Sequence, residues 1–304
     1  MKKIILGLIA WQSLALATDI EKGYTGIEFD TNTSIINTEK KIENPLFKKY
    51  SLMKINNEYL VKTLTDDNTD RENIYKLAYT FSKIDNSKGN GFNLLYSYSP
   101  ELEKRIGFNL NYTDLDSKNS KGDFSQLNIF YSYKDYSDFT HFFTTLYSGY
   151  SKEKSKTSSK LNSKFIGLYT KYSDVIDNYY DNFYPKFYIE NDIKRIEEKP
   201  KTSKNKKRKN SSINFGIGTE LEKVIYEEAL KISIIPIISY NHEFLSKKKY
   251  KDSKDPFEQE ARIGVELKAE YNEVSKLFIR YDYKKSFNTS NNMNVFTAGI
   301  KIML

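Results

Sequence analysis

The residues that could do covalent or metal chemistry in this sequence are few. There are two histidines, His141 and His242, and no cysteine. A histidine-based metal or hydrolase site would need both histidines to converge with carboxylates. The sequence contains no Gly-x-Ser-x-Gly motif and no phosphate-binding glycine loop. We therefore expect no catalytic site, no metal site and no cofactor.

Charged residues instead alternate with apolar ones near the C-terminus. Every second residue of 263–271 and of 277–283 is apolar, and most of the residues between them are charged. Successive side chains of a β-strand point to opposite faces, so the charges share one face and can pair across neighbouring strands. This face holds Arg262, Glu266, Lys268, Glu270, Arg280, Asp282 and Lys301. If the strands enclose a lumen, these charges either form a salt-bridged wall, tune pore selectivity or hold an N-terminal segment.

The same alternation continues through most of the chain and predicts about twelve strands. They lie near residues 74–84, 91–99, 105–114, 123–134, 139–150, 160–173, 183–194, 211–222, 229–244, 257–271, 274–286 and 292–304. Strands of a soluble β-sandwich also alternate but usually have about 5–6 residues, whereas membrane strands need about 9–11. The 25 tyrosines and 19 phenylalanines suit aromatic girdles at two membrane interfaces. The predicted fold class is all-β, a transmembrane antiparallel β-barrel of the outer-membrane type.

The N-terminus has the pattern of a secretory signal peptide over residues 1–17. Two lysines precede an apolar core at 4–11, and Ala15-Leu16-Ala17 is a small-residue cleavage site. The apolar run is too short to cross a bilayer about 30 Å thick, and no other segment approaches 18 consecutive apolar residues. We therefore expect export through a cleaved signal peptide to the bacterial outer membrane.

Residues 18–73 form a short segment ahead of the barrel at 74–304. Asn44-Pro45 could be an N-cap followed by proline at the first helical position, which predicts a helix after residue 44. This segment is either a helix that enters the pore or a linker.

The end of the chain carries a possible assembly signal. Thr297, Gly299, Ile302 and Leu304 follow a polar-x-Gly-x-x-apolar-x-apolar pattern. This pattern resembles the C-terminal signal of bacterial outer-membrane barrels, which the barrel assembly machinery recognises by adding the strand to a sheet edge. The barrel assembly machinery is therefore an expected partner.

A basic run at 194–210 is expected to be an extracellular loop, because long polar connections alternate with short ones along the predicted barrel. It contains nine Lys or Arg and two Glu. Such a run attracts polyanions, or it is simply a solvated loop. Outer-membrane lipids, lipopolysaccharide and host surface polymers are the candidate partners, and the export signal argues against nucleic acid.

The last third of the chain resembles the closing strands of the autotransporter (type V secretion) translocator domain. The matching residues are Gly264-Val265-Glu266-Leu267, the hairpin through Tyr271-Asn272, Arg280-Tyr281-Asp282-Tyr283 and Ala298-Gly299-Ile300. The resemblance implies a twelve-stranded barrel, a helix through the pore and export of an N-terminal passenger.

The sequence departs from that family in two ways, and these limit what the resemblance implies. Leu304 stands where the family usually has an aromatic residue, and only residues 18–73 precede the barrel. We therefore expect a translocator-type pore lacking a large passenger. The alternatives are a porin-like channel, a surface adhesin presenting basic extracellular loops, and a secreted soluble β protein.

Overall fold

The computed structural model describes the barrel and part of a helix. The described residues are 55–57, 59, 60, 62, 64 and 71–304 without 85–86, 118–119, 137–139, 156–160, 176–181, 201–207, 246–258 and 288–291. All of them belong to the compact unit Asn44–Leu304. The expected signal peptide and the Asn44-Pro45 helix start lie outside the described residues.

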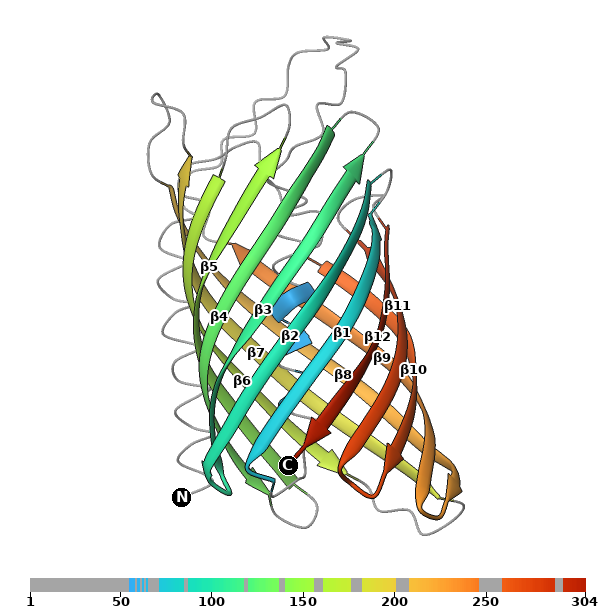
Figure 1. The fold of residues 1–304 in the computed structure, drawn as a ribbon. Helices are drawn as coiled ribbons and strands as arrows, with labels where there is room; N and C mark the ends of the chain where they lie inside the picture. The colour runs from blue at the N-terminus through green and yellow to red at the C-terminus, as the bar shows by residue number, and fades with distance from the viewer. Residues whose placement is uncertain are drawn as a thin grey trace. The chain divides into compact units, whose positions relative to one another are not determined.

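Twelve antiparallel strands close into a barrel in which each strand pairs with its neighbours in sequence (Figure 1). The strands are β1 (Asn73–Ile84), β2 (Ser87–Glu101), β3 (Lys104–Ser117), β4 (Ser120–Tyr136), β5 (Thr140–Ser155), β6 (Leu161–Val175), β7 (Phe183–Pro200), β8 (Arg208–Glu227), β9 (Leu230–Leu245), β10 (Gln259–Tyr271), β11 (Ser275–Ser286) and β12 (Asn292–Met303). This architecture confirms the predicted fold class and strand count, and it excludes the soluble sandwich.

The barrel is closed by the pairing of β1 with β12. The register runs from Ile74 opposite Met303 to Ile84 opposite Met293. At the end of this seam the backbones of Asn73 and Leu304 exchange two hydrogen bonds, of 2.8 and 2.9 Å. Closure gives both terminal strands hydrogen-bonding partners, which an apolar membrane interior requires.

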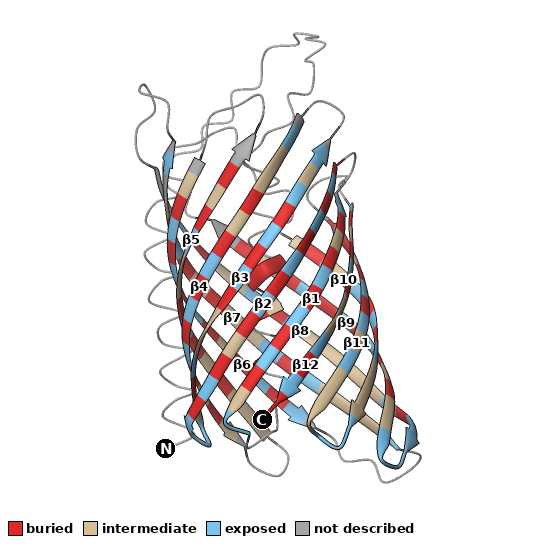
Figure 2. Ribbon diagram, viewed as in Figure 1, coloured by how far each residue is buried: buried red, intermediate tan, exposed pale blue. Residues whose placement is uncertain are grey.

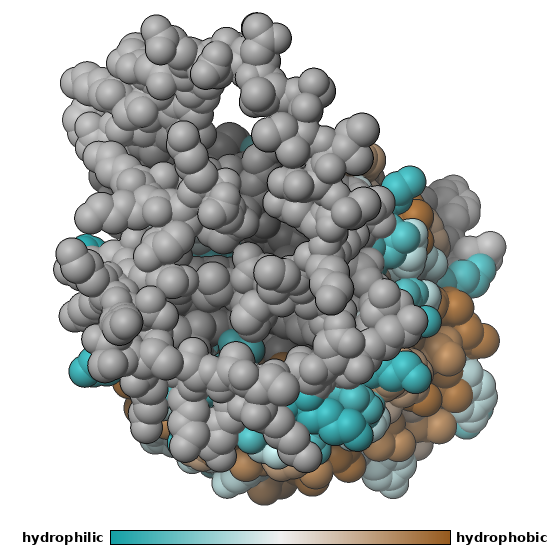
Figure 3. Space-filling view, turned by 90° about the horizontal axis from the view of Figure 1, so that it is seen from above, coloured by the Kyte–Doolittle hydropathy of each residue, from teal (hydrophilic) through white to brown (hydrophobic). Residues whose placement is uncertain are grey.

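The two faces of the wall differ in chemistry as the alternation predicts. Figure 2 shows buried and exposed residues alternating along each strand. The outward residues are mostly large and apolar, for example Leu77, Ile238 and Ile263, which are exposed by 51%, 55% and 61%. Figure 3 shows apolar side chains gathered on the visible outside of the wall. An exposed apolar surface of this extent suits contact with lipid.

Outward aromatic side chains flank the aliphatic ones. On β1, Leu77 lies between Tyr75 and Tyr79, and the ring of Tyr75 packs against Tyr96 of β2 with 5.1 Å between centroids. Nearer the other end of β2, Phe92 packs against Tyr112 of β3 at 5.7 Å. An aliphatic band with aromatic residues on either side is the arrangement of the two aromatic girdles of a membrane barrel.

The connection within the basic run 194–210 is shorter than the sequence predicts. β7 continues to Pro200 and β8 begins at Arg208, so only residues 201–207 join them. Lys194 is buried on the inner face, 3.5 Å from both Asp192 and Glu243. The prediction of a loop over 194–200 and 208–210 is wrong, because a strand that extends past the bilayer no longer needs an apolar face.

The connections differ in length between the two ends of the barrel only in part. Those at the end opposite the C-terminus span 85–86, 118–119, 156–160, 201–207, 246–258 and 287–291, so the first two are as short as the turns at the other end and the expected alternation of long and short connections is wrong there. Those at the end that carries the C-terminus span 102–103, 137–139, 176–182, 228–229 and 272–274. Between β10 and β11, Asn272 and Glu273 have φ of 46° and 56°, and the Val274 N–H donates to the Tyr271 carbonyl at 3.0 Å. Two positive φ angles let the chain reverse tightly within this three-residue connection between antiparallel strands. The predicted turn at 272–273 is confirmed.

Among the described residues, no helix is long and apolar enough to cross a membrane.

The β1–β12 seam predicts the effect of removing the last strand. Deleting Phe296–Leu304 would leave most of β1 without its partner, so we expect the barrel to lose closure and the heat-modifiable gel mobility of a folded barrel. Leu304→Ala, which keeps the register, should retain both. A truncated chain that still inserts into outer membranes with heat-modifiable migration would contradict this assignment.

A helix against a charged wall in the barrel lumen

The described helical residues between 55 and 64 lie inside the barrel and have two faces. Asn57, Leu60 and Leu64 follow the spacing i, i+3, i+7. Ile55, Tyr59 and Lys62 follow i, i+4, i+7 and form the other face. Because residues three and four apart lie on one side of an α-helix, each face meets a different part of the lumen.

The first face packs on an apolar and aromatic half of the lumen. Leu60 and Leu64 are buried to 0% and 1% exposure. Their cluster consists of inward side chains from β2 and β4–β7, namely Leu95, Phe124, Phe130, Phe143, Tyr147, Phe165, Tyr169 and Ile196. Beside it, the Gln126 side-chain amide donates 2.9 Å hydrogen bonds to the side-chain oxygens (Oδ1) of Asn57 and Asn128.

The second face meets the half of the wall formed by β10–β12 and β1. Ile55 packs with Met293 and Val295 of β12. The Lys76 ammonium of β1 lies 4.6 Å from the centroid of the Tyr59 ring. Lys62 forms an ion pair of 2.6 Å with Glu266 of β10. The helix therefore contacts opposite sides of the barrel.

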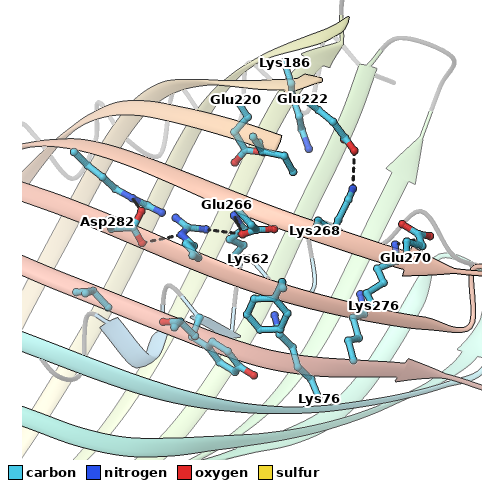
Figure 4. Close-up of a pocket in the computed structure, with 18 of the residues that line it drawn as sticks. Lys62, Lys76, Lys186, Glu220, Glu222, Glu266, Lys268, Glu270, Lys276 and Asp282 are labelled. Carbon is cyan, nitrogen blue, oxygen red and sulfur yellow. Dashed lines mark hydrogen bonds and ion pairs between the residues drawn. The ribbon is translucent and has the colours of Figure 1, made fainter. Parts of the chain in front are cut away.

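Glu266 joins Lys62 to a chain of charges on the wall. Arg280 lies 3.7 Å from Glu266 and 2.7 Å from Asp282, and Asp282 also accepts a 2.8 Å hydrogen bond from Arg262 (Figure 4). All five side chains are at most 19% exposed. Alternating signs compensate the cost of removing these charges from water.

The seven charges singled out from the sequence all line one cavity. It has a volume of about 580 Å³ and lies between the helix and the charged half of the wall. Within it Lys268 pairs with Glu222 at 2.7 Å, and Glu270 pairs with Lys276 at 3.2 Å. The seven are Arg262, Glu266, Lys268, Glu270, Arg280, Asp282 and Lys301.

The four residues of the candidate assembly signal lie on both faces of β12. Thr297 is buried on the inner face, whereas Ile302 and Leu304 are outward and 37% and 61% exposed. Gly299 lies opposite Phe278 of β11. A Cβ on Gly299 would come within 2.7 Å of the Phe278 ring and 2.5 Å of the Leu77 carbonyl oxygen. Glycine at this position therefore allows an inward aromatic ring to lie over β12.

The two histidines lie on opposite faces of the wall. His141 lines the cavity, whereas His242 lies on β9 between the buried inward residues Asn241 and Glu243 and so points the other way. They cannot converge on one ligand. Among the described residues no group of three or more His, Asp or Glu is arranged to hold a metal ion.

Several residues of this site escaped the sequence analysis. Lys62, Tyr59 and Leu60 belong to the segment treated there as a helix or a linker, and the helix expected after residue 44 was assigned no wall contacts. The spacing 55/59/62 and 57/60/64 was a usable signal, since it predicts a helix with two different faces. Lys76 is the only charged residue on the inward face of β1, so the pattern of that strand did not single it out. Lys276 continues the charged inward face of β11 that holds Arg280 and Asp282, and that alternation was a usable signal for it.

Comparison with known proteins shows a shared fold. No family model and no curated protein matches the sequence. The beta domain of the Bordetella autotransporter BrkA is 13% identical, covers 78% of this chain and 100% of its own, and gives a TM-score of 0.57. The translocator domain of the autotransporter NalP from Neisseria meningitidis is 9% identical, with coverage of 84% and 97% and a TM-score of 0.57.

A third solved structure, LpxR from Salmonella typhimurium, is 8% identical, with coverage of 75% and 100% and a TM-score of 0.50. Identities this low establish the fold alone. At that level the predicted resemblance to autotransporter translocator barrels is confirmed.

Simple magnitudes rank the contacts that hold the helix. Burying a leucine side chain contributes roughly 2 kcal/mol, so Leu60 and Leu64 dominate. The Lys62–Glu266 pair faces a cavity and Lys62 is 19% exposed, so solvent screening reduces its contribution to about 1 kcal/mol. The apolar face holds the helix in the lumen, and the ion pair sets its rotation.

These magnitudes predict a graded response in a double-mutant cycle. Lys62→Gln, Glu266→Gln and the double variant should show a coupling of about 1 kcal/mol, or about fivefold in the fraction of time that a single barrel conducts in a planar bilayer.

Two further variants control this experiment. Leu64→Ala, which opens a hole in the apolar contact, should raise conduction more than Lys62→Gln does. Lys83→Gln on the outer face of β1 should change nothing. Additive single effects would show that Lys62 and Glu266 do not hold the helix together.

Proposed function

We propose that this protein is an outer-membrane β-barrel of the autotransporter translocator type whose pore is occupied by its own N-terminal helix. The observation that supports this most strongly is the placement of Leu60 and Leu64 at full burial within the lumen. A twelve-stranded barrel is wider than the eight-stranded kind that its own side chains fill, so a helix or water must occupy it.

The fold alone does not decide the activity. Barrels of this fold carry out unrelated activities, so the likeness to autotransporter domains and to LpxR does not separate transport from catalysis. What favours a non-enzymatic role is the character of the inner face. The carboxylates that line the cavity each lie within 4 Å of a Lys or Arg, as in the Arg262–Asp282–Arg280 chain, which suits structural salt-bridging better than acid–base catalysis.

Two alternatives keep the barrel and change its use. A porin-like channel would have a lumen open to solutes, and the helix contacts weigh against it. A surface adhesin would bind host polymers through the connections opposite the C-terminal end. The exposed basic residues Arg195 and Lys199, near the end of β7, favour anionic polymers there.

The cellular setting follows from the same proposal. Export through a cleaved signal peptide at 1–17 would deliver the chain to the periplasm. The barrel assembly machinery would then insert it by recognising β12. The outward apolar surface would contact membrane lipids and lipopolysaccharide. The C-terminal end would face the periplasm, since the connections at that end are mostly short.

This orientation predicts where protease cuts. Trypsin added to intact cells should cleave within residues 201–207, which contain four lysines, and leave the strands protected. The fragments should be identified by mass. Cleavage of this connection only after the outer membrane is permeabilised would show that the orientation is the reverse.

The occupied pore predicts small or intermittent conductance of the mature protein in planar bilayers. Deleting residues 18–72 removes the helix and should raise the conductance sharply, because the lumen of the remaining barrel would fill with water. Outer-membrane fractionation and heat-modifiable mobility would show that the deletion variant still folds. Equal and steady conductance with and without the segment would support the porin-like alternative.

A further inference from the structure

Three exposed cations gather on the outer face of β6 and β7, near the barrel end opposite the C-terminus. Lys164 of β6 lies directly opposite Tyr150 of β5 and Glu197 of β7. Its two diagonal neighbours on β7 are Arg195 and Lys199. Diagonal neighbours have Cβ atoms about 7–8 Å apart, so side chains as long as these can meet on one ligand. We call Lys164, Arg195 and Lys199 the basic patch.

The basic patch begins where the apolar band of the outer face ends. Arg195 is directly opposite Ile166 of β6, which is 51% exposed, and it follows Ile193 on the outer face of β7. Lys164 follows Ile166 on the outer face of β6 in the same way. If the outward apolar residues contact lipid tails, the first cations beyond them lie at the level of the headgroups.

Two side chains of β5 extend the same boundary. Tyr150 is 40% exposed beside Lys164, and a tyrosine with an apolar ring and a polar tip suits the edge of a membrane. Lys152 is two residues further along the outer face of β5 and is diagonal to Lys164 on the side away from β7. Cations therefore lie on both sides of Lys164.

We propose that the basic patch binds the phosphate group of a lipid in the membrane leaflet at this end of the barrel. Arginine presents a planar fork of donors that matches phosphate, and lysine adds a compact point charge on a flexible stem. The tails of the same lipid would lie on the exposed residues Ile166 and Leu168 of β6. This inference rests on the proposed function, because it requires a barrel that spans a membrane.

A soluble polyanion suits this position less well than a lipid does. Arg195 lies at the edge of the apolar band, whereas a polymer outside the membrane would meet the strand end, where Lys199 lies. A free phosphate ion offers the headgroup chemistry but has no tail to lie on the apolar band. Both sources are separate arms of the test.

The test is the effect of a phosphorylated lipid on the stability of the full-length barrel in micelles of a non-ionic detergent. The probe is lipid A added to the micelles, and the comparison is the same lipid with its phosphates removed. Lipid A should raise the midpoint temperature of the heat-modifiable gel shift more than the dephosphorylated lipid does. The dependence on lipid concentration gives the apparent dissociation constant.

Two double variants separate the basic patch from general attraction between charges. Lys164→Gln, Arg195→Gln should raise the apparent dissociation constant for lipid A roughly tenfold, because each exposed charge pair contributes a few-fold. The matched control is Lys83→Gln, Lys285→Gln. It removes two exposed outward lysines at the same end of β1 and β11 and should keep the original dissociation constant. The midpoint without lipid shows whether each variant folds, and Arg195→Gln alone should still weaken binding about threefold.

Three results would overturn the proposal. One is an equal shift with lipid A and with the dephosphorylated lipid. Another is a dissociation constant that the Lys164 and Arg195 variants leave unchanged or that the control variant raises equally. The third is the same shift with inorganic phosphate or a soluble sulfated polysaccharide alone, which would assign the effect to a free anion or a polymer. In all three cases the heat-modifiable shift would still report a folded barrel, so the proposed function would stand independently.

Discussion

The structure depends on the pairing of β1 with β12. Every backbone group of a lipid-facing strand must find its partner within the protein, because the membrane interior offers no water. The seam from Ile74–Met303 to Ile84–Met293 meets this requirement for the two terminal strands. Once the seam is formed, the wall has no edges, and one face of each strand must be apolar while the other faces a lumen.

A barrel closed by twelve strands encloses a lumen that must be filled. In the half formed by β2–β7 it is filled by bulky side chains such as Phe124 and Tyr147, against which Leu60 and Leu64 of the helix pack. The inner face of the other half, from β8 through β12 to β1, carries many charged side chains, and a cavity lies beside it. The helix therefore packs on apolar side chains on one side, and on the other it borders ion pairs and a cavity. This arrangement fits the proposed role of the helix as an occupant of the pore.

Much of this could be read from the sequence because strand alternation is a local property. Arg262 to Tyr271 has one apolar and one charged face, and the structure places those faces outside and inside. The turn at Asn272 and Glu273 was equally local. The ends of β7 and β8 could not be predicted in this way. There the strands are held by pairing with their neighbours, and their own residues do not alternate between apolar and polar. The partners of Lys62 could not be predicted either, because Glu266 is more than 200 residues away and the pairing depends on how the helix is rotated. That Lys301 lies opposite both Lys76 and Lys276 depends on the register between three strands, which no single strand reveals.

The central claim is that the helix occupies the lumen of the folded barrel, and cross-linking measures this most directly. The chain has no cysteine, so an Asn57→Cys, Gln126→Cys variant carries the only two thiols. These positions are joined by a 2.9 Å hydrogen bond between helix and wall. A short thiol-specific cross-linker applied to isolated outer membranes should join them in most molecules, which shows as altered mobility after boiling in SDS. An Asn57→Cys, Lys83→Cys pair, with the second thiol on the outer face, should not react in this way. Absence of cross-linking in the first pair, with both thiols shown to be reactive, would contradict the account.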